Sequence, residues 1–461
     1  MPESWDLVIT GGTVVADGTA AAASVAVRRG RIAGLLAPGT PAGAGEVVDA
    51  RGLHVLPGVI DTHVHTRHPG VAAREDFTSG TGAAAAGGIT TLLEMPISKL
   101  PANSGEAVRR RVAALEPEAV IDFALYGGAG QENVDAIQEQ AHAGVVAFKT
   151  FLQPPPPARL DEFFGLWCTD ETALREVVAA VGATGLPHAF HCEHAPLYLG
   201  LQQRLERAGR TDGPAHAESR PPIAEEVSVA IVLALGAEAG GRVHVVHLSS
   251  PRSAQFVAEA RARGVRVTAE TCPPYLFLTV DALAAHAGFA KCNPPLRSAE
   301  DVEGLWRYVR TGAIDVLGTD HSPFLEEEKA RGAENIFLAP PGLCSLEVLL
   351  PLMLTAVAEG RLTLTDLVRL TSGRAAEIFR LPGKGRLAPG ADADLVLVDL
   401  RADWIFDHEQ AHTRARANMR AWTGRRLRGR VVSTFVRGVR VFHEGAITGT
   451  PGHGRFVRPA G

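Results

Sequence analysis

The sequence predicts an α/β fold, a (β/α)8 TIM barrel with a small β-sandwich domain built from both ends of the chain. Three observations predict it. The middle of the 461-residue chain alternates apolar runs with helical segments, and both ends carry short strand-like runs without a helical period. No glycine-rich phosphate loop follows any apolar run, which disfavours a nucleotide-binding doubly wound sheet. We expect residues 1–54 and 383–461 to form the small domain and residues 55–382 the barrel.

The two ends of the chain have the pattern of β-hairpins. Residues 6–12 and 24–33 alternate apolar and polar side chains and are broken by glycines, and residues 393–399 and 429–442 repeat this pattern. Chain ends often lie close together in space. The two ends are therefore expected to share one small β domain.

Eight apolar runs in the middle of the chain are candidate barrel strands. They are apolar almost throughout, as expected of parallel strands covered on both faces. These candidate strands end near His65, Met95, Gly127, Phe151, Cys192, Ser249, Cys272 and Ser322.

Helices fit between these runs, and residues 171–181 are the clearest example. Apolar side chains recur there at i, i+3, i+4 and i+7, from Leu174 to Val181. Thr169 or Asp170 can cap the start of this helix, and Gly185 can end it.

Composition and charge exclude several classes of function. Mean hydropathy is +0.06 and no apolar stretch reaches the roughly 18 residues of a spanning helix, so we expect no membrane partner. The net charge of −5 comes without a basic tract, which argues against nucleic acid. The five cysteines are scattered and the N-terminus lacks a signal-peptide pattern, so we expect a cytoplasmic protein with free thiols.

Polar side chains gather where the candidate strands end, which is where barrel enzymes carry their active sites. His63 and His65 are two residues apart, so on a strand they point to the same face. A single strand-end histidine is more often a hydrogen-bonded core residue than a ligand, and His244, three residues before His247, is expected only to pack. What favours a metal site is the full set of strand-end residues: His63, His65, Lys149, His191, His247 and Asp320.

Lys149 has the most unusual position of this set. An ammonium group inside an apolar strand carries a large desolvation cost unless it is paired or neutral. A neutral lysine amine can add carbon dioxide, and the resulting carbamate is an anionic ligand able to bridge two metal ions. Four imidazoles, one bridging carbamate and one aspartate would then hold two divalent ions. Zinc suits these ligands best, and manganese, iron or cobalt also fit.

At these residues the sequence resembles the cyclic amidohydrolases: allantoinases, dihydropyrimidinases (hydantoinases) and dihydroorotases. The resemblance implies a metal-dependent hydrolase barrel in which His63, His65 and Asp320 hold the more buried metal. His191 and His247 would hold the second metal, N6-carboxylated Lys149 would bridge the two, and Asp320 would act as the catalytic base. The motifs that carry the resemblance are residues 57–65, 88–91, 148–149, 191–193, 247–250, 270–273, 291–295, 319–323 and 385–394.

Three stretches resemble the allantoinase branch, residues 94–101, 148–151 and 217–221. Dihydropyrimidinases typically carry a tyrosine shortly after the bridging lysine, and residues 152–157 contain none. Of the three side chains with which dihydroorotases hold a carboxylate, only Arg67 is matched. Arg67 is expected either to face a substrate oxygen or to pair with Glu75 or Asp76.

The resemblance therefore implies hydrolytic ring opening of a small cyclic amide or ureide, chiefly allantoin to allantoate in purine catabolism. The alternatives are dihydropyrimidinase or dihydroorotase activity, and a catalytically inactive family scaffold. Backbone groups around Asn293 and Gly342 are expected to bind the ring. A homo-oligomer, a dimer or homotetramer, is the expected assembly, and residues 153–157 and 198–222 are candidates for a lid or a subunit contact.

Overall fold

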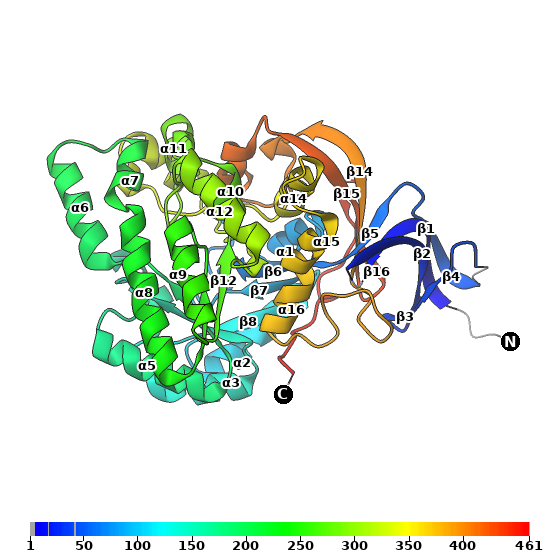
Figure 1. Cartoon of the computed structure of the whole chain (residues 1–461), viewed down its shortest axis with the longest axis horizontal. Coiled ribbons are helices and arrows are strands. Elements are labelled where there is room, and N and C mark those ends of the chain that lie inside the picture. The colour runs from blue at the N-terminus through cyan, green and yellow to red at the C-terminus, as the bar shows by residue number, and fades with distance from the viewer. Residues whose placement is uncertain (1–4, 17, 41–42, 461) are drawn as a thin grey trace.

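The computed structural model describes residues 5–16, 18–40 and 43–460 and shows an elongated molecule, with one sheet inside a ring of helices and a second sheet beside it, toward the N-terminal end (Figure 1). One sheet is parallel and eight-stranded, with neighbours in strict sequence order from β6 to β13. Its strands are β6 (Val59–Val64), β7 (Ile89–Glu94), β8 (Asp122–Gly128), β9 (Ala147–Phe151), β10 (Pro187–His191), β11 (Arg242–Val245), β12 (Val267–Thr271) and β13 (Val316–Leu317).

This sheet closes on itself, so the predicted (β/α)8 barrel is confirmed. Val64 in β6 forms a parallel bridge with His321, and the amide of His65 donates to the carbonyl of His321 at 2.8 Å. Two strands end earlier than predicted, β11 at Val245 and β13 at Leu317. The backbone leaves the extended region soon after these points, at His247 (φ 41°) and Asp320 (φ 49°).

Helices follow the strands and cover the outside of the barrel (Figure 1). The helix predicted for residues 171–181 is α5 (Glu171–Thr184), capped by the Asp170 carboxylate and ended by Gly185 at φ 71°. The other helices with barrel strands before them are α1 (Phe77–Ala86), α2 (Gly105–Leu115), α3 (Ile137–Ala143), α8 (Pro222–Ala239), α9 (Pro251–Ala262), α12 (Ala299–Thr311) and α14 (Leu349–Ala358). Shorter or inserted helices are α4 (Leu160–Phe163), α6 (Ala195–Arg207), α7 (Gly213–Ser219), α10 (Pro273–Phe277), α11 (Asp281–His286), α13 (Glu326–Ala330), α15 (Leu364–Val368) and α16 (Arg374–Ile378).

The second sheet is mixed, nine-stranded and built from both ends of the chain, as predicted. β14 pairs with β5 and thereby joins the C-terminal strands to the N-terminal ones, and buried side chains such as Leu7, Val25 and Phe435 share one core. Its strands are β1 (Trp5–Ala16), β2 (Thr19–Arg28), β3 (Arg31–Leu36), β4 (Ala44–Asp49), β5 (His54–Pro57), β14 (Leu395–Ile405), β15 (Arg426–Val436), β16 (Val439–His443) and β17 (Ala446–Ile447).

The passage from this sheet into the barrel is a single residue, Gly58, between β5 and β6. A Cβ at this position would lie 2.1 Å from the side-chain oxygen of Thr90, so only glycine fits. His63 and His65 follow immediately, so this close packing fixes the strand that carries them.

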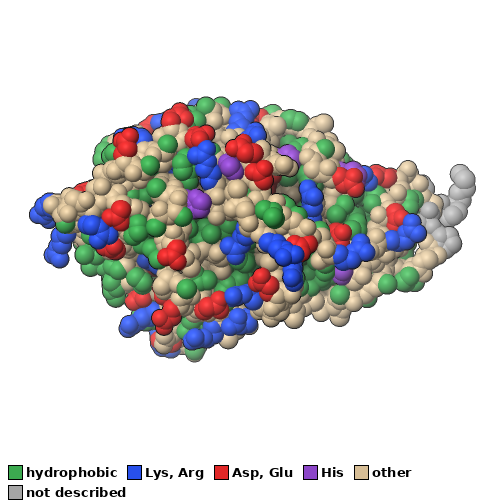
Figure 2. Space-filling model, turned by 90° about the horizontal axis from the view of Figure 1, so that it is seen from above, with side chains coloured by type: hydrophobic (Ala, Val, Ile, Leu, Met, Phe, Trp, Pro, Cys, Tyr) green, Lys and Arg blue, Asp and Glu red, His purple; other side chains and the backbone are tan. Residues whose placement is uncertain are grey.

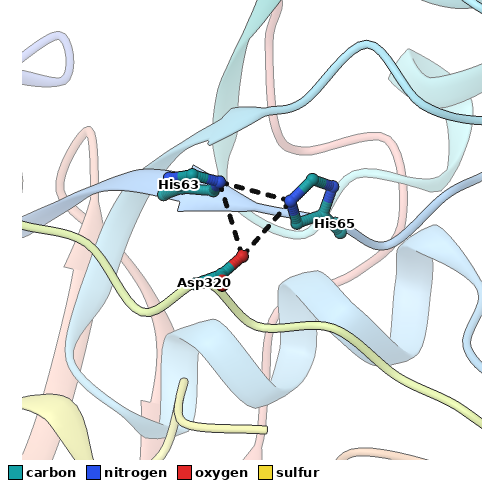
Figure 3. A group of neighbouring side chains, drawn as sticks. All are labelled: His63, His65 and Asp320. Carbon is teal, nitrogen blue, oxygen red and sulfur yellow. Dashed lines mark hydrogen bonds and ion pairs between the residues drawn. The ribbon is translucent and has the colours of Figure 1, made fainter. Parts of the chain in front are cut away.

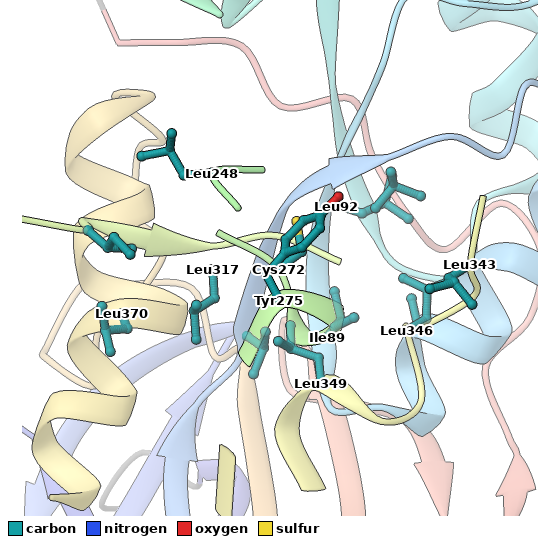
Figure 4. Close-up of a cluster of buried hydrophobic side chains, with 14 of the residues drawn as sticks. Ile89, Leu92, Leu248, Cys272, Tyr275, Leu317, Leu343, Leu346, Leu349 and Leu370 are labelled. Atoms are coloured by element: carbon teal, nitrogen blue, oxygen red, sulfur yellow. The ribbon is translucent and has the colours of Figure 1, made fainter. Parts of the chain in front are cut away.

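The main apolar core lies between the barrel strands and their helices, and Figure 4 shows part of it around Ile89, Leu317 and Leu349. The five cysteines are buried and free. The face seen in Figure 2 carries acidic and basic side chains interspersed among apolar ones. Among the described residues, no helix combines the length and the hydrophobicity that a membrane span requires.

Candidate metal centre

The structure brings three predicted ligands together at the C-terminal end of the barrel. The Nε2 atoms of His63 and His65 are 3.2 Å apart, and Asp320 Oδ1 lies 3.4 Å from the first and 3.3 Å from the second (Figure 3). Burial lowers the pKa of His65 to about 3, so its imidazole is neutral, the form that binds metal. Three ligand atoms therefore converge on one point.

A second pair of imidazoles lies next to the first. His191 Nδ1 is 3.0 Å from His247 Nε2, and the ring centroids of His63 and His247 are 5.3 Å apart. Burial lowers the pKa of both His191 and His247, which keeps both rings neutral. All four histidines thus present nitrogen atoms toward one region.

Lys149 lies on β9 with its side chain fully buried. Within the described part of the chain its Nζ has no hydrogen-bond partner, and it lies 5.0 Å from the centroid of the Phe151 ring. Burial lowers the pKa of Lys149 to about 8. This shift makes the neutral amine far more accessible near neutral pH than it is for an exposed lysine.

Buried carboxylates hold the backs of the imidazoles. Glu270 Oε1 accepts from His63 Nδ1 at 2.8 Å, which leaves His63 Nε2 as a lone-pair donor for a metal. Asp61 accepts from the amides of His63 and Thr319, at 3.1 and 2.9 Å, and ties β6 to the segment that carries Asp320. Burial raises the pKa of Asp61 to about 7.

The second imidazole pair has its own support. Glu193 Oε2 lies 2.9 Å from His191 Nε2 and 2.5 Å from Arg220 Nη1, so the Nδ1 atom of His191 stays free to face His247. The guanidinium of Arg220 also stacks 3.7 Å from the ring centroid of Tyr198. Burial opposes ionisation of Glu193, but Arg220 and His191 outweigh it and lower its pKa.

Sequence reasoning did not assign roles to these supporting residues. Asp61, Glu193 and Glu270 all lie inside the recognised motifs, which was the available signal. His244 was expected only to pack. It packs against Phe379, but it also bonds to Thr268 and lies 3.8 Å from Glu270, so it belongs to the same buried network.

The four histidines and Asp320 open into a cleft of about 910 Å³, which the predicted substrate residues also line. Arg67 does not pair with Glu75 or Asp76, because its guanidinium donates to the carbonyl of Pro323 at 2.9 Å and to the Ser322 hydroxyl. The amide of Gly342 donates to the carbonyl of Lys291 at 2.8 Å. Asn293 Oδ1 is buried and lacks a partner among the described residues.

Comparison with known proteins agrees with this geometry. The model of the amidohydrolase family matches residues 54–441. The chain belongs to the amidohydrolase family. An allantoinase of Rubrobacter xylanophilus is 39% identical over 458 residues, covering 99% of this chain and 98% of that protein. An allantoinase of Escherichia coli is 36% identical over 438 residues, 94% of each chain.

Solved structures give the same answer for the fold of this amidohydrolase. The L-hydantoinase (dihydropyrimidinase) of Arthrobacter aurescens has a TM-score of 0.94 and 32% sequence identity, covering 98% of this chain and 100% of that one. A D-hydantoinase structure has a TM-score of 0.89 and 28% identity. The likeness therefore includes both the barrel and the small mixed sheet.

A second acidic cluster of this amidohydrolase is not a metal site. Asp122, Asp392 and Asp394 lie close enough to hold an ion. However, the ammonium of Lys384 already occupies the space between them, at 2.5, 3.1 and 2.7 Å from their respective oxygens.

Proposed function

We propose that this amidohydrolase opens the ring of a cyclic ureide by hydrolysis, converting allantoin to allantoate. The allantoinase relatives support this assignment, because they match nearly the whole chain at 39% and 36% identity. A site able to activate water supports it independently. The observation that carries the proposal is the convergence of ring nitrogens from four buried histidines near Asp320 and Lys149, whose Nζ has no hydrogen-bond partner among the described residues.

These residues fit two divalent metal ions. His63, His65 and Asp320 would hold one, through atoms that already lie within 3.4 Å of one another. His191 and His247 would hold the other. A carbamate on Lys149 would supply the anionic oxygens between them, and the buried amine has no competing partner in the described chain. Imidazole and carboxylate ligands favour zinc, with manganese, iron or cobalt as further candidates.

When bound, such ions lower the pKa of water and polarise an amide carbonyl. The chain itself supplies the proton transfer. Asp320 turns Oδ1 toward His63 and His65, which leaves its second carboxylate oxygen to take a proton from the attacking water and to deliver it to the departing ring nitrogen. Burial opposes ionisation of Asp320, but His63, His65 and Lys149 lower its pKa, so it is a carboxylate before the reaction.

Hydantoinase (dihydropyrimidinase) activity is the second candidate, because the L-hydantoinase structure matches 98% of this chain with a TM-score of 0.94. Dihydroorotase activity is less well supported, since both Nη atoms of Arg67 are already engaged by Ser322 and Pro323. An inactive scaffold is disfavoured because all six ligand positions carry residues able to bind metal.

A substrate panel tests this proposal. The purified protein, loaded with zinc, would be assayed on allantoin, hydantoin, dihydrouracil and dihydroorotate, before and after chelation and after return of the metal. We expect the highest kcat/KM on allantoin, loss of turnover on chelation, and about two metal ions per chain by elemental analysis. A fully loaded protein that opens none of the four rings would refute the proposal.

We also propose a homo-oligomer, a dimer or tetramer, that works in purine breakdown in the cytoplasm. Five free buried thiols suit a reducing compartment. Leu199 on α6 and Ile223 at the start of α8 expose 38% and 46% of their surface, and a second subunit can pack against them. Light scattering of the protein as it elutes from a size-exclusion column gives the mass of the assembly. A monomer at micromolar concentration would contradict the proposed homo-oligomer.

A further inference from the structure

Two lysines near the mouth of the barrel are buried without a carboxylate partner in the described chain, Lys291 and Lys329. An ammonium group has three donors. Lys329 uses all of them on backbone carbonyls, those of Lys291 at 3.1 Å, Pro340 at 3.0 Å and Gly342 at 2.7 Å. Lys329 therefore ties together the two segments that carry Asn293 and Gly342, and it has no donor left for a ligand.

Lys291 differs from Lys329 in two respects. Its Nζ donates only twice, to the carbonyls of Ile336 at 2.8 Å and Ala339 at 2.7 Å, so one N–H is left. Its side chain also lines the catalytic cleft, with 5% of its surface exposed. Burial, then the positive charges of Arg220 and Lys329, lowers the pKa of Lys291, so its ammonium form, which keeps the third N–H, would be stabilised by an acceptor oxygen. This remaining donor is well placed for an oxygen atom supplied by a ligand.

An acceptor lies two residues further along. Asn293 Oδ1 is buried, lacks a partner in the described chain, and belongs to a residue that lines the same cleft. Lys291, two residues earlier, lines this same cleft. The segment thus offers one N–H donor and one amide acceptor to the same cleft.

We propose that Lys291 and Asn293 determine specificity by binding a ureido substituent on the substrate ring. Lys291 Nζ would donate to the ureido carbonyl, and Asn293 Oδ1 would accept from a ureido N–H. A ureido group carries this acceptor and donor together in a substituent, and an unsubstituted hydantoin or dihydropyrimidine has no such substituent. The inference rests on the proposed ring-opening function and names the feature that separates allantoin from plain hydantoins.

The expected loss of specificity follows from the hydrogen-bonding groups that a substrate without a ureido substituent leaves unpaired. A site built to hydrogen-bond a substrate group discriminates strongly against an analogue that lacks it, because the buried polar atoms are then left unsatisfied. Replacement of Lys291 by methionine removes the donor and keeps an unbranched chain. We expect the ratio of kcat/KM for allantoin to kcat/KM for hydantoin to fall by about 10- to 100-fold.

Lys329→Met is the matched control, since it removes a neighbouring buried ammonium that has no donor for substrate. It should lower turnover of both substrates by the same factor and leave the ratio unchanged. Asn293→Leu provides a second test if Lys291→Met does not fold, and circular dichroism would verify the fold of each variant. Binding of allantoin to the metal-free protein, measured by calorimetry, should weaken in Lys291→Met by a similar factor.

The outcomes separate the two proposals. Turnover of allantoin by the wild type together with an unchanged ratio and unchanged allantoin binding in Lys291→Met and Asn293→Leu would overturn the specificity assignment alone. No ring opening by the wild type, on any cyclic ureide, would overturn the proposed function and the specificity assignment with it.

Discussion

Lys384 is the residue whose loss should most disturb the junction between the barrel and the small sheet. Its ammonium lies 2.5 Å from Asp122 at the start of β8, and 2.7 and 3.1 Å from Asp394 and Asp392 just before β14. The side chains of Lys384, Asp122 and Asp394 are 2–4% exposed. Replacement of Lys384 by methionine would leave these carboxylates buried without their main counter-ion.

The expected loss of stability depends on the contacts that the aspartates keep after Lys384 is replaced. Removal of one partner of a buried ion pair typically costs about 3–5 kcal/mol, because the other charge stays desolvated. Here Arg437 still pairs with Asp122, and its amide donates to Asp394 at 2.8 Å. We therefore expect a loss near the lower end, about 3 kcal/mol of unfolding free energy at pH 7. This is a large fraction of a typical stability of about 5–15 kcal/mol.

The pH dependence has a definite sign. Burial opposes the charge on Lys384, but the three aspartates raise its pKa above 10.5, so its contribution is present below that value and is lost as pH rises through the folded pKa. Burial also opposes ionisation of Asp122, but Lys384 and Arg437 lower its pKa below 3.8, so its contribution is lost only as pH falls through that lower value. In Lys384→Met the aspartates bind protons more readily, so the deficit should shrink as pH falls from 7 toward 4.

Urea unfolding of wild type and variant, followed by circular dichroism and tryptophan fluorescence, measures this loss. Lys99→Met is the control, because Lys99 also pairs with two carboxylates, Asp161 at 2.9 Å and Glu162 at 3.2 Å, but its side chain is 47% exposed. Such a surface pair contributes about 0–1 kcal/mol. Equal and small losses in the two variants would refute the reasoning.

Two further predictions concern the metal centre. Glu270→Gln should weaken metal binding by about 10- to 100-fold without loss of the fold, because the carboxylate no longer holds His63 in the correct tautomer. Metal titration measures the affinity, and circular dichroism verifies the fold. An unchanged metal affinity would contradict the role assigned to Glu270. Lys149→Met should abolish ring opening yet make the metal-free protein more stable, by about 1–3 kcal/mol, because a buried amine without a partner is replaced by an apolar chain of similar length. Urea unfolding in the presence of a chelator gives the comparison, and a less stable metal-free variant would mean that Lys149 has a structural partner.

Much of the fold was predictable because a barrel strand is covered on both faces and therefore apolar throughout. All eight predicted strands are present, and the α5 helix begins at the predicted Asp170 cap. His63 and His65 converge as their spacing on a strand requires. These features depend on local periodicity, which a sequence displays directly.

The supporting contacts were not predictable in the same way, because they join residues far apart in the chain. Glu270 is 207 positions from His63, and nothing near Glu270 in the sequence indicates that it accepts from an imidazole. The donor count that separates Lys291 from Lys329 depends on which carbonyls surround each ammonium. Strand ends were misplaced at β11 and β13 for a related reason, since the turns there are set by tertiary contacts rather than by local propensity.

Three residues of the site, Arg67, His247 and Asp320, adopt positive φ angles of 59°, 41° and 49°. Each such conformation costs about 1–3 kcal/mol for a residue other than glycine and persists only where surrounding contacts enforce it. Glu94 accepts from the amide of Arg67 at 3.0 Å, Glu270 from that of His247 at 3.4 Å, and Asp61 from that of Thr319, next to Asp320. Glu270, which orients the His63 imidazole, therefore also helps to hold the strained backbone at His247. A single substitution such as Glu270→Gln consequently acts on tautomer and main chain together, which is why its effect should appear in metal affinity before it appears in the stability of the barrel.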